Sequence, residues 1–176
     1  MINLFMQRLI TSIFTIPNFF DCLATFALIL LLSLIALPVG FQQGFLEINI
    51  LKLPLKKIIY IIICNLLITA IFEELFFRVL FLPHPRENPD NTIFLLSVTF
   101  SWVCFLLYHP INALTFYPAG YPTFMNPIFL FLAGLLGIIC TISYLGSGSV
   151  WTCVFIHWLV LLVWISLLGG YNKLAK

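Results

Sequence analysis

Charged residues are scarce in this chain. Asp, Glu, Lys and Arg make up 8% of its 176 residues, whereas hydrophobic residues make up 62% and the mean hydropathy is +1.15. Soluble domains contain about 25% charged residues, and disordered segments combine high charge with low hydrophobicity. The scarcity of charge therefore excludes both classes and predicts an integral membrane protein.

Long basic runs and paired cysteines are also missing. The longest basic run is Lys56-Lys57, and the formal net charge is +2. So little positive charge cannot hold a phosphate backbone, and we expect no nucleic-acid partner. The five cysteines stand in apolar stretches without a CxxC pair, which favours reduced, buried thiols over a disulfide framework or a zinc site. We expect no cofactor and no bound metal.

What the chain has instead is long apolar runs. A hydrocarbon core about 30 Å thick needs about 20 helical residues to cross it. Charge-free runs of that size predict an all-α, polytopic transmembrane helical bundle with five spans. The predicted spans cover residues 22–41, 58–82, 92–109, 126–145 and 149–168, and Pro110 is expected to end the third.

The start of the chain differs from these spans. In its first 16 residues, apolar side chains recur at helical spacing, and polar ones such as Arg8 and Ser12 fill the opposite face. This pattern predicts an amphipathic helix in the membrane interface, ended by Pro17, rather than a signal peptide. We divide the chain into an N-terminal part with this helix, the first span and a basic loop (1–57), a core (58–168) and a short basic tail (169–176).

Lysine and arginine are distributed unevenly between the two sides of the membrane. With five spans, the loop after the first span and the C-terminus share one side, and the other side has Arg8 and Arg86. Because basic residues favour the cytoplasmic side, we expect a cytoplasmic C-terminus. The basic residues on that side are Lys52, Lys56, Lys57, Lys173 and Lys176.

Three charged residues stand inside the second predicted span: Glu73, Glu74 and Arg78. A charge at the bilayer centre costs at least about 2.5–3.5 kcal/mol, so this cluster requires a reason. Glu74 and Arg78 are four residues apart and share a helix face, so they can pair, whereas Glu73 is directed about 100° away from Glu74. An acid left unpaired in an apolar site can serve as a general base near neutral pH. The alternative is a helix-end cluster that snorkels to the interface.

Two other spans carry histidine. His109 closes the third span and His157 lies in the fifth. Each is either a functional residue or a core histidine bonded to a backbone carbonyl. Ionisable groups on three apolar helices are expected to converge on one wet cavity, which is a hydrolytic arrangement, although Glu73 and His109 differ in depth by roughly 12 Å. The third histidine, His84, stands in the proline-rich connector 83–90 and is expected to be solvated.

The ordered motifs resemble a known family. The segment 73–78 reads EELFFR and fits the motif EExxxR, and Phe105 with His109 fits the motif FxxxH. His157 stands where the third motif of that family places a histidine. Over residues 58–168 the chain resembles the CPBP family (CAAX prenyl protease and bacteriocin-processing, also called Abi) of intramembrane glutamate proteases.

The resemblance implies a helical bundle around a polar cavity and a metal-independent intramembrane endopeptidase. It implies that Glu73 activates water, that His109 helps to position this water, and that His157 helps to stabilise the oxyanion. The implied partners are membrane lipid and a membrane-embedded or lipid-anchored peptide or protein substrate. The supporting residues would be Glu74, Arg78 and Phe105.

One position departs from the family pattern. The third motif usually reads HxxxN or HxxxD, but the fourth residue after His157 is Leu161. The loss of one oxyanion donor can reduce a rate about 10²–10³-fold. Two other functions therefore stay open: a non-catalytic membrane protein of the same fold, with an immunity or scaffold role, and a small transporter or channel, for which no internal repeat is visible.

The motifs of other intramembrane proteases are missing. HExxH is absent, which excludes a zinc protease of the site-2 type, and the GxGD of presenilin-type aspartyl proteases is absent too. The nearest match to the GxSG of rhomboid-type serine proteases begins with Leu145 in place of glycine. A dyad of Ser147 or Ser149 with His157 is one interpretation, and a Gly/Ser turn between two spans is the other.

Overall fold

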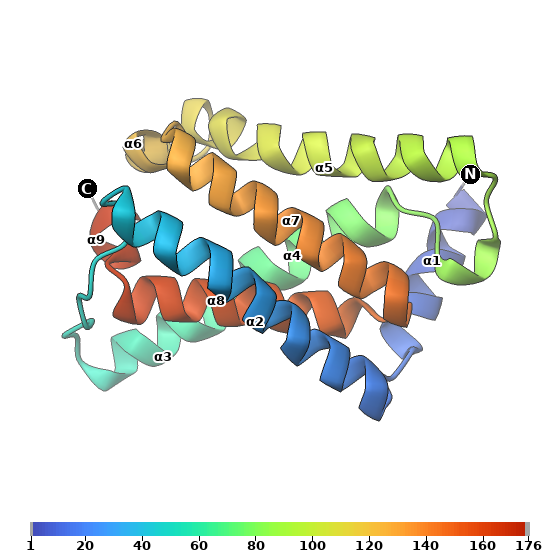
Figure 1. The fold of residues 1–176 in the computed structure, drawn as a ribbon, viewed down its shortest axis with the longest axis horizontal. Coiled ribbons are helices and arrows are strands. Elements are labelled where there is room, and N and C mark those ends of the chain that lie inside the picture. Colours follow the sequence, from blue (N-terminus) through green and yellow to red (C-terminus); the bar gives the residue numbers. More distant parts are fainter. Residues whose placement is uncertain (1, 175–176) are drawn as a thin grey trace.

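The computed structural model describes residues 2–174 and confirms the all-helical class (Figure 1). Five helical segments are long and apolar enough to cross a membrane, in agreement with the five charge-free runs. The spanning segments are α2 (Phe19–Gln42), the run 55–80, α5 (Asn91–Leu114), α7 (Pro127–Ser147) and α8 (Val150–Leu167). The short helices are α1 (Ile2–Phe14), η3 (Pro85–Glu87), η4 (Pro118–Gly120), α6 (Tyr121–Phe124) and α9 (Gly170–Leu174).

The second span changes its helical type along its length. α3 (Leu55–Cys64) passes into a π-helical segment, η1 (Asn65–Ile71), then a single α-turn, α4 (Phe72–Glu74), and a second π-helical segment, η2 (Leu75–Leu80). π-Helical insertions are rare and are frequently found at functional sites. The two adjacent acids of this span occupy the α-turn between the two insertions.

α7 lies at the centre of the bundle, where it packs against α2, α5 and α8 (Figure 1). In an 18-residue stretch of α7, 56% of the residues are buried inside the protein, compared with 11% in α2. Small residues permit this packing: a Cβ on Gly137 would lie 3.0 Å from the Phe105 ring of α5. One polar contact accompanies it, because the Trp102 indole N–H donates to the Gly134 carbonyl at 2.9 Å. The α5–α7 contact therefore fixes the position of Phe105.

The prediction that Pro110 ends the third span is wrong, because α5 continues to Leu114. Proline removes one backbone donor and disfavours the helix interior, but tertiary packing can override such a preference. His109, the residue before the proline, packs edge-on against Phe124 and Phe129, with ring centroids 5.7 and 5.2 Å apart. These contacts hold the proline turn against the bundle.

The helix predicted at the start of the chain is present as α1, and part of its polar face packs against the protein. Arg8 donates to both carboxylate oxygens of Glu87, at 2.7 and 2.6 Å, and the buried Ser12 hydroxyl lies 2.8 Å from that of Tyr144. Because these polar groups find partners, their burial carries no large penalty. The exposed apolar side chains of α1 include those of Leu4, Met6, Ile10 and Phe14.

The prediction that His84 is solvated is wrong, since its side chain is 4% exposed. Its Nδ1 accepts from the Arg86 N–H at 3.2 Å, so Nε2 carries the proton and donates to the Gly148 carbonyl at 3.1 Å. Gly148 has a φ of +67°, and a Cβ there would lie 3.0 Å from the imidazole. The proline-rich connector therefore folds back onto the turn between α7 and α8.

The two ends of the bundle differ in charge. Figure 1 shows α9, the start of α3 and the ends of α2 and α5 at one end, and α1 at the other. The connectivity places Arg8 and Arg86 at the α1 end. Lys176, which the topology prediction also uses, lies outside the described residues, as does the end of the predicted tail 169–176. The basic residues described at the α9 end are Lys52, Lys56, Lys57 and Lys173.

Candidate active site

The acidic pair of α4 is buried in the protein. Glu73 is 6% exposed, and Glu74 and Arg78 are 0% exposed. The alternative of a cluster that snorkels to the interface is therefore wrong. Arg78 Nε lies 3.1 Å from Glu74 Oε2, so the ion pair predicted from the four-residue spacing is confirmed.

α5 holds the arginine of this pair from the other side. The Arg78 guanidinium carbon lies 4.9 Å from the centroid of the Phe105 ring, a distance suited to a cation–π contact. Its Nη1 lies 3.4 Å from the hydroxyl of Ser101, which donates to the Phe77 carbonyl at 2.6 Å. Ser101 was not among the predicted site residues, although a buried serine in an apolar span is a signal that the sequence offers.

His157, from α8, contacts both acids. Its Nδ1 lies 2.7 Å from Glu74 Oε1, and its Nε2 lies 3.9 Å from Glu73 Oε2. The Nδ1 proton therefore donates to Glu74. A protonated His157 would complete a row of alternating charges: Glu73, His157, Glu74 and Arg78. Such alternation offsets the cost of burying each charge by itself.

His109, from α5, is held by its own helix. Its Nδ1 donates to the Phe105 carbonyl at 2.9 Å, the backbone contact expected of a core histidine. In the neutral imidazole Nε2 is then an acceptor, and it has no hydrogen-bond partner among the described residues. The Phe105 ring lies next to both imidazoles, with centroids 5.0 Å from His109 and 6.1 Å from His157.

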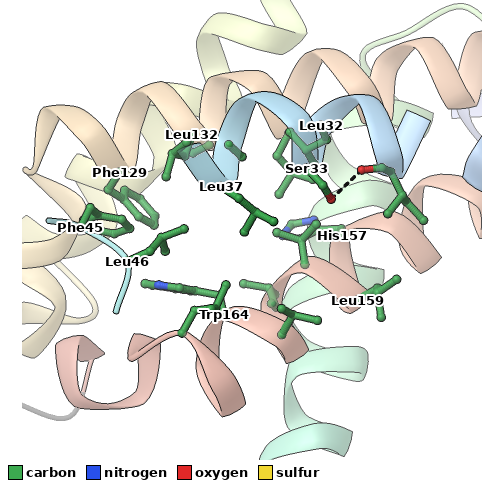
Figure 2. Close-up of a pocket in the computed structure, with 18 of the residues that line it drawn as sticks. Leu32, Ser33, Leu37, Phe45, Leu46, Phe129, Leu132, His157, Leu159 and Trp164 are labelled. Atoms are coloured by element: carbon green, nitrogen blue, oxygen red, sulfur yellow. Dashed lines mark hydrogen bonds between the residues drawn. The ribbon is translucent and has the colours of Figure 1, made fainter. Parts of the chain in front are cut away.

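A cavity of about 200 Å³ lies beside these residues. Both histidines line it, and its other walls are mostly apolar side chains of α2, α5, α7, α8 and the loop after α2. Figure 2 shows His157 toward one end, and Phe45, Phe129 and Trp164 at the other. Leu37, on the α2 wall, is 38% exposed, so part of this wall also faces the outside of the bundle.

The structure brings most of the predicted site residues together, but it does not join Glu73 to His109. Glu73, Glu74, Arg78 and His157 form one contiguous cluster. No hydrogen bond joins Glu73 to His109 in the described part of the chain, and Glu73 is not among the lining residues of the cavity.

The serine dyad is wrong. The Ser147 hydroxyl is bonded to the Ser143 carbonyl at 2.8 Å and to the Thr152 hydroxyl at 2.9 Å. The Ser149 hydroxyl accepts from the Trp151 N–H at the start of α8. Both serines therefore stabilise the turn between α7 and α8, as the Gly/Ser-turn interpretation requires.

The comparison with protein families covers the spans that carry this cluster. A family model described as type II CAAX prenyl endopeptidase Rce1-like matches residues 55–163, which is more than half of the chain. No curated protein and no solved structure matches the chain. The family resemblance inferred from the motifs is confirmed, and with the five apolar segments it makes the protein a multi-pass membrane protein. The chain therefore belongs to the Rce1-like type II CAAX prenyl endopeptidases, a family of proteases.

Proposed function

We propose that this protein is a metal-independent intramembrane endopeptidase in which Glu73 activates water. One observation carries the proposal: of two adjacent buried acids, Glu74 accepts from His157 Nδ1 at 2.7 Å and lies 3.1 Å from Arg78 Nε, whereas Glu73 Oε2 has no hydrogen-bond partner among the described residues and lies 3.9 Å from His157 Nε2. An unpartnered carboxylate beside a histidine that lines a cavity is suited to general-base catalysis.

The proposed reaction assigns one role to each group. Glu73 removes a proton from water that His109 Nε2 helps to position, and the water oxygen attacks the carbonyl carbon of the peptide bond. The protonated His157 donates from Nε2 to the oxyanion, which preorganised donors stabilise. Glu73 then passes the proton to the leaving amine as the C–N bond breaks. Glu74 and Arg78 hold His157 in place.

The proposed substrate is a membrane-embedded or lipid-anchored peptide. The cavity walls are mostly apolar and one of them includes Leu37, which is exposed on the outside of a spanning helix, and this suits a ligand that arrives from lipid. We further propose that the C-terminus is cytoplasmic, because four lysines lie at the α9 end. Accessibility of a cysteine placed at Asn172 to a membrane-impermeant thiol reagent, in sealed vesicles of known orientation, tests this topology.

The purified protein in lipid vesicles is expected to cleave a lipid-anchored peptide in the presence of excess EDTA. Mass spectrometry of the products identifies the bond that is broken. Ser147→Ala serves as a control, because the hydrogen bonds of Ser147 within residues 2–174 are to Ser143, Ser149 and Thr152, around the turn between α7 and α8, and it should cleave at the wild-type rate. Loss of activity in EDTA with recovery on adding zinc would contradict the metal-independent mechanism.

A non-catalytic protein of the same fold is the second candidate, and Leu161 favours it. Leu161 lines the same cavity as His157, at the position where the family motif has a hydrogen-bond donor.

If the protein is an active but slow protease, Leu161→Asn should raise kcat by up to about 10²-fold, since one oxyanion donor contributes that much. Cleavage of a model membrane peptide measures this effect.

Leu161→Ala is the matched control, since it removes the leucine side chain without adding an amide. Leu161→Ala should show no gain in kcat. If the asparagine of Leu161→Asn finds no hydrogen-bond partner, that variant should lose about 1–3 kcal/mol of stability in detergent. Destabilisation with no gain would mean that other groups hold the oxyanion, and no cleavage by wild type or variant would support the non-catalytic candidate.

A further inference from the structure

The second span ends on a carbonyl that the following residues leave without a donor. Leu80 is the last residue of η2, and the last carbonyls of a helix have no partner within it. The nearest donors along the chain would stand three to five positions later, but Pro83 and Pro85 have no backbone N–H. The His84 N–H is used elsewhere, because it donates to Glu87 Oε1 at 2.8 Å. A protein partner for the Leu80 carbonyl therefore has to come from another part of the chain.

Arg8 supplies this partner from α1. Its Nη1 donates to the Leu80 carbonyl at 3.4 Å. Its Nε and Nη2 donate to the two carboxylate oxygens of Glu87, at 2.7 and 2.6 Å, and such a two-pronged contact fixes the orientation of a guanidinium. These three contacts, here called the Arg8 clamp, join the end of η2 to the connector that follows it.

α1 is also fixed to the other side of the bundle. The buried Ser12 hydroxyl lies 2.8 Å from the hydroxyl of Tyr144 on α7. The Trp151 indole on α8 donates to the Ile13 carbonyl at 2.8 Å. Along its length α1 packs against η2, and Figure 1 shows α1 and the connector at the same end of the bundle. α1 therefore bridges the second span and the start of α8.

The clamped carbonyl is close to the proposed catalytic cluster. Leu80 follows Arg78 by two residues, and Arg78 Nε lies 3.1 Å from Glu74 Oε2. Glu74 in turn accepts from His157, so a shift at the end of η2 would move the ion pair and the imidazole that it holds. Misplacement by about 1 Å can cost about 10²-fold in rate, even when the substituted residue lies far from the reacting atoms.

We propose that Arg8 is a positioning residue for the reaction: its clamp holds the end of η2, and with it the arginine of the buried ion pair, in the place that catalysis needs. The inference rests on the proposed function for the reaction that it assists. Arg8 does not line the cavity, so it acts through η2 and not on the substrate. It also precedes residues 55–163, so the family model does not cover it.

Arg8→Gln tests the proposal, because it removes the guanidinium that makes all three contacts. With a lipid-anchored peptide, kcat should fall about 10-fold while KM stays within about 2-fold, since the displacement affects the cluster and not the cavity wall. Amide hydrogen exchange, followed by mass spectrometry, should become faster in residues 76–82. The melting temperature in detergent should change little, because the pair of Arg8 and Glu87 is partly exposed.

Arg86→Gln is the matched control. It removes an equal charge from the same connector, but Arg86 is exposed and its side chain forms no ion pair within residues 2–174. It should keep the wild-type kcat and the wild-type exchange in residues 76–82. The comparison separates the clamp from a general effect of net charge.

Two further variants separate the parts of the clamp. Glu87→Gln breaks the ion pair but leaves Arg8 able to donate to Leu80, so its loss of kcat should be smaller than in Arg8→Gln. The double variant should lose no more than Arg8→Gln alone, because the two residues act in one network. Arg8→Lys keeps the charge but not the two-pronged geometry, so its kcat should lie between those of Arg8→Gln and wild type.

Unchanged kcat together with unchanged exchange in residues 76–82 of Arg8→Gln would overturn the proposal. A loss of activity that appears in KM, or one that Arg86→Gln reproduces, would overturn it as well. The exchange measurement needs no activity. Faster exchange in Arg8→Gln, in a protein whose wild type cleaves no peptide, would therefore retain the clamp as a support of η2 and reject the proposed function.

Discussion

Glu73→Gln is expected to abolish peptide-bond cleavage and to leave the folded protein intact. Glutamine keeps the shape of the side chain but cannot accept the proton of water, so the general base is lost. Glu73 makes no ion pair with Arg78, and His157 keeps its contact with Glu74 at 2.7 Å, so the substitution leaves no buried charge without a partner. Activity on a lipid-anchored peptide and the melting temperature in detergent measure the two effects.

Glu73→Asp is the companion variant, since it keeps the carboxylate and moves it by one methylene. It should retain a low activity, because displacement of a catalytic group by about 1 Å can cost about 10²-fold. The pair of variants separates loss of the base from loss of the fold. Full activity in Glu73→Gln would falsify the proposed mechanism.

Glu74→Gln is expected to have its main effect on stability. It removes the ion pair with Arg78, which is 0% exposed, and it replaces the charged acceptor of His157 Nδ1 with a neutral amide oxygen. A buried charge left without its partner costs about 3–5 kcal/mol. Chemical or thermal unfolding in detergent should therefore show a much larger loss of stability than in Glu73→Gln, and activity should fall as His157 loses its support.

Glu87→Gln provides the control for this prediction. It also breaks an ion pair, with Arg8, but the two side chains are 17% and 26% exposed, and pairs that solvent reaches contribute about 0–1 kcal/mol. Replacing Arg78 by Met in the Glu74→Gln background should recover part of the lost stability, since it removes the unpaired charge. An equal effect of Glu74→Gln and Glu87→Gln would contradict the buried network.

The parts of the site that the sequence predicts are those governed by local spacing. The Glu74–Arg78 pair follows from a four-residue helical separation, and the five spans follow from the length of apolar runs that a bilayer requires. The contact between Glu74 and His157 joins residues 83 positions apart. The charges predict that such groups meet, but spacing cannot say which of two adjacent acids the imidazole binds.

Two wrong predictions, at Pro110 and His84, share a physical cause. Each follows from a local preference that a distant partner outweighs. The turn at Pro110 is held by the packing of His109 on Phe129, and His84 by the Gly148 carbonyl. The π-helical segments that flank the acids contact α8, and no residue pattern in the sequence marks them.

Phe105 and His109, the two ends of the FxxxH motif, make different contacts. Phe105 holds the imidazole of His109 through its main-chain carbonyl, a group that any residue at that position would supply. Its ring packs beside the His109 imidazole and also contacts the Arg78 guanidinium and Gly137. The phenylalanine therefore supports the ion pair on the second span as well as the histidine of its own motif, whereas the histidine tautomer depends only on the main-chain carbonyl. A residue of the FxxxH motif on α5 is thus constrained partly by its contact with an arginine on a different helix.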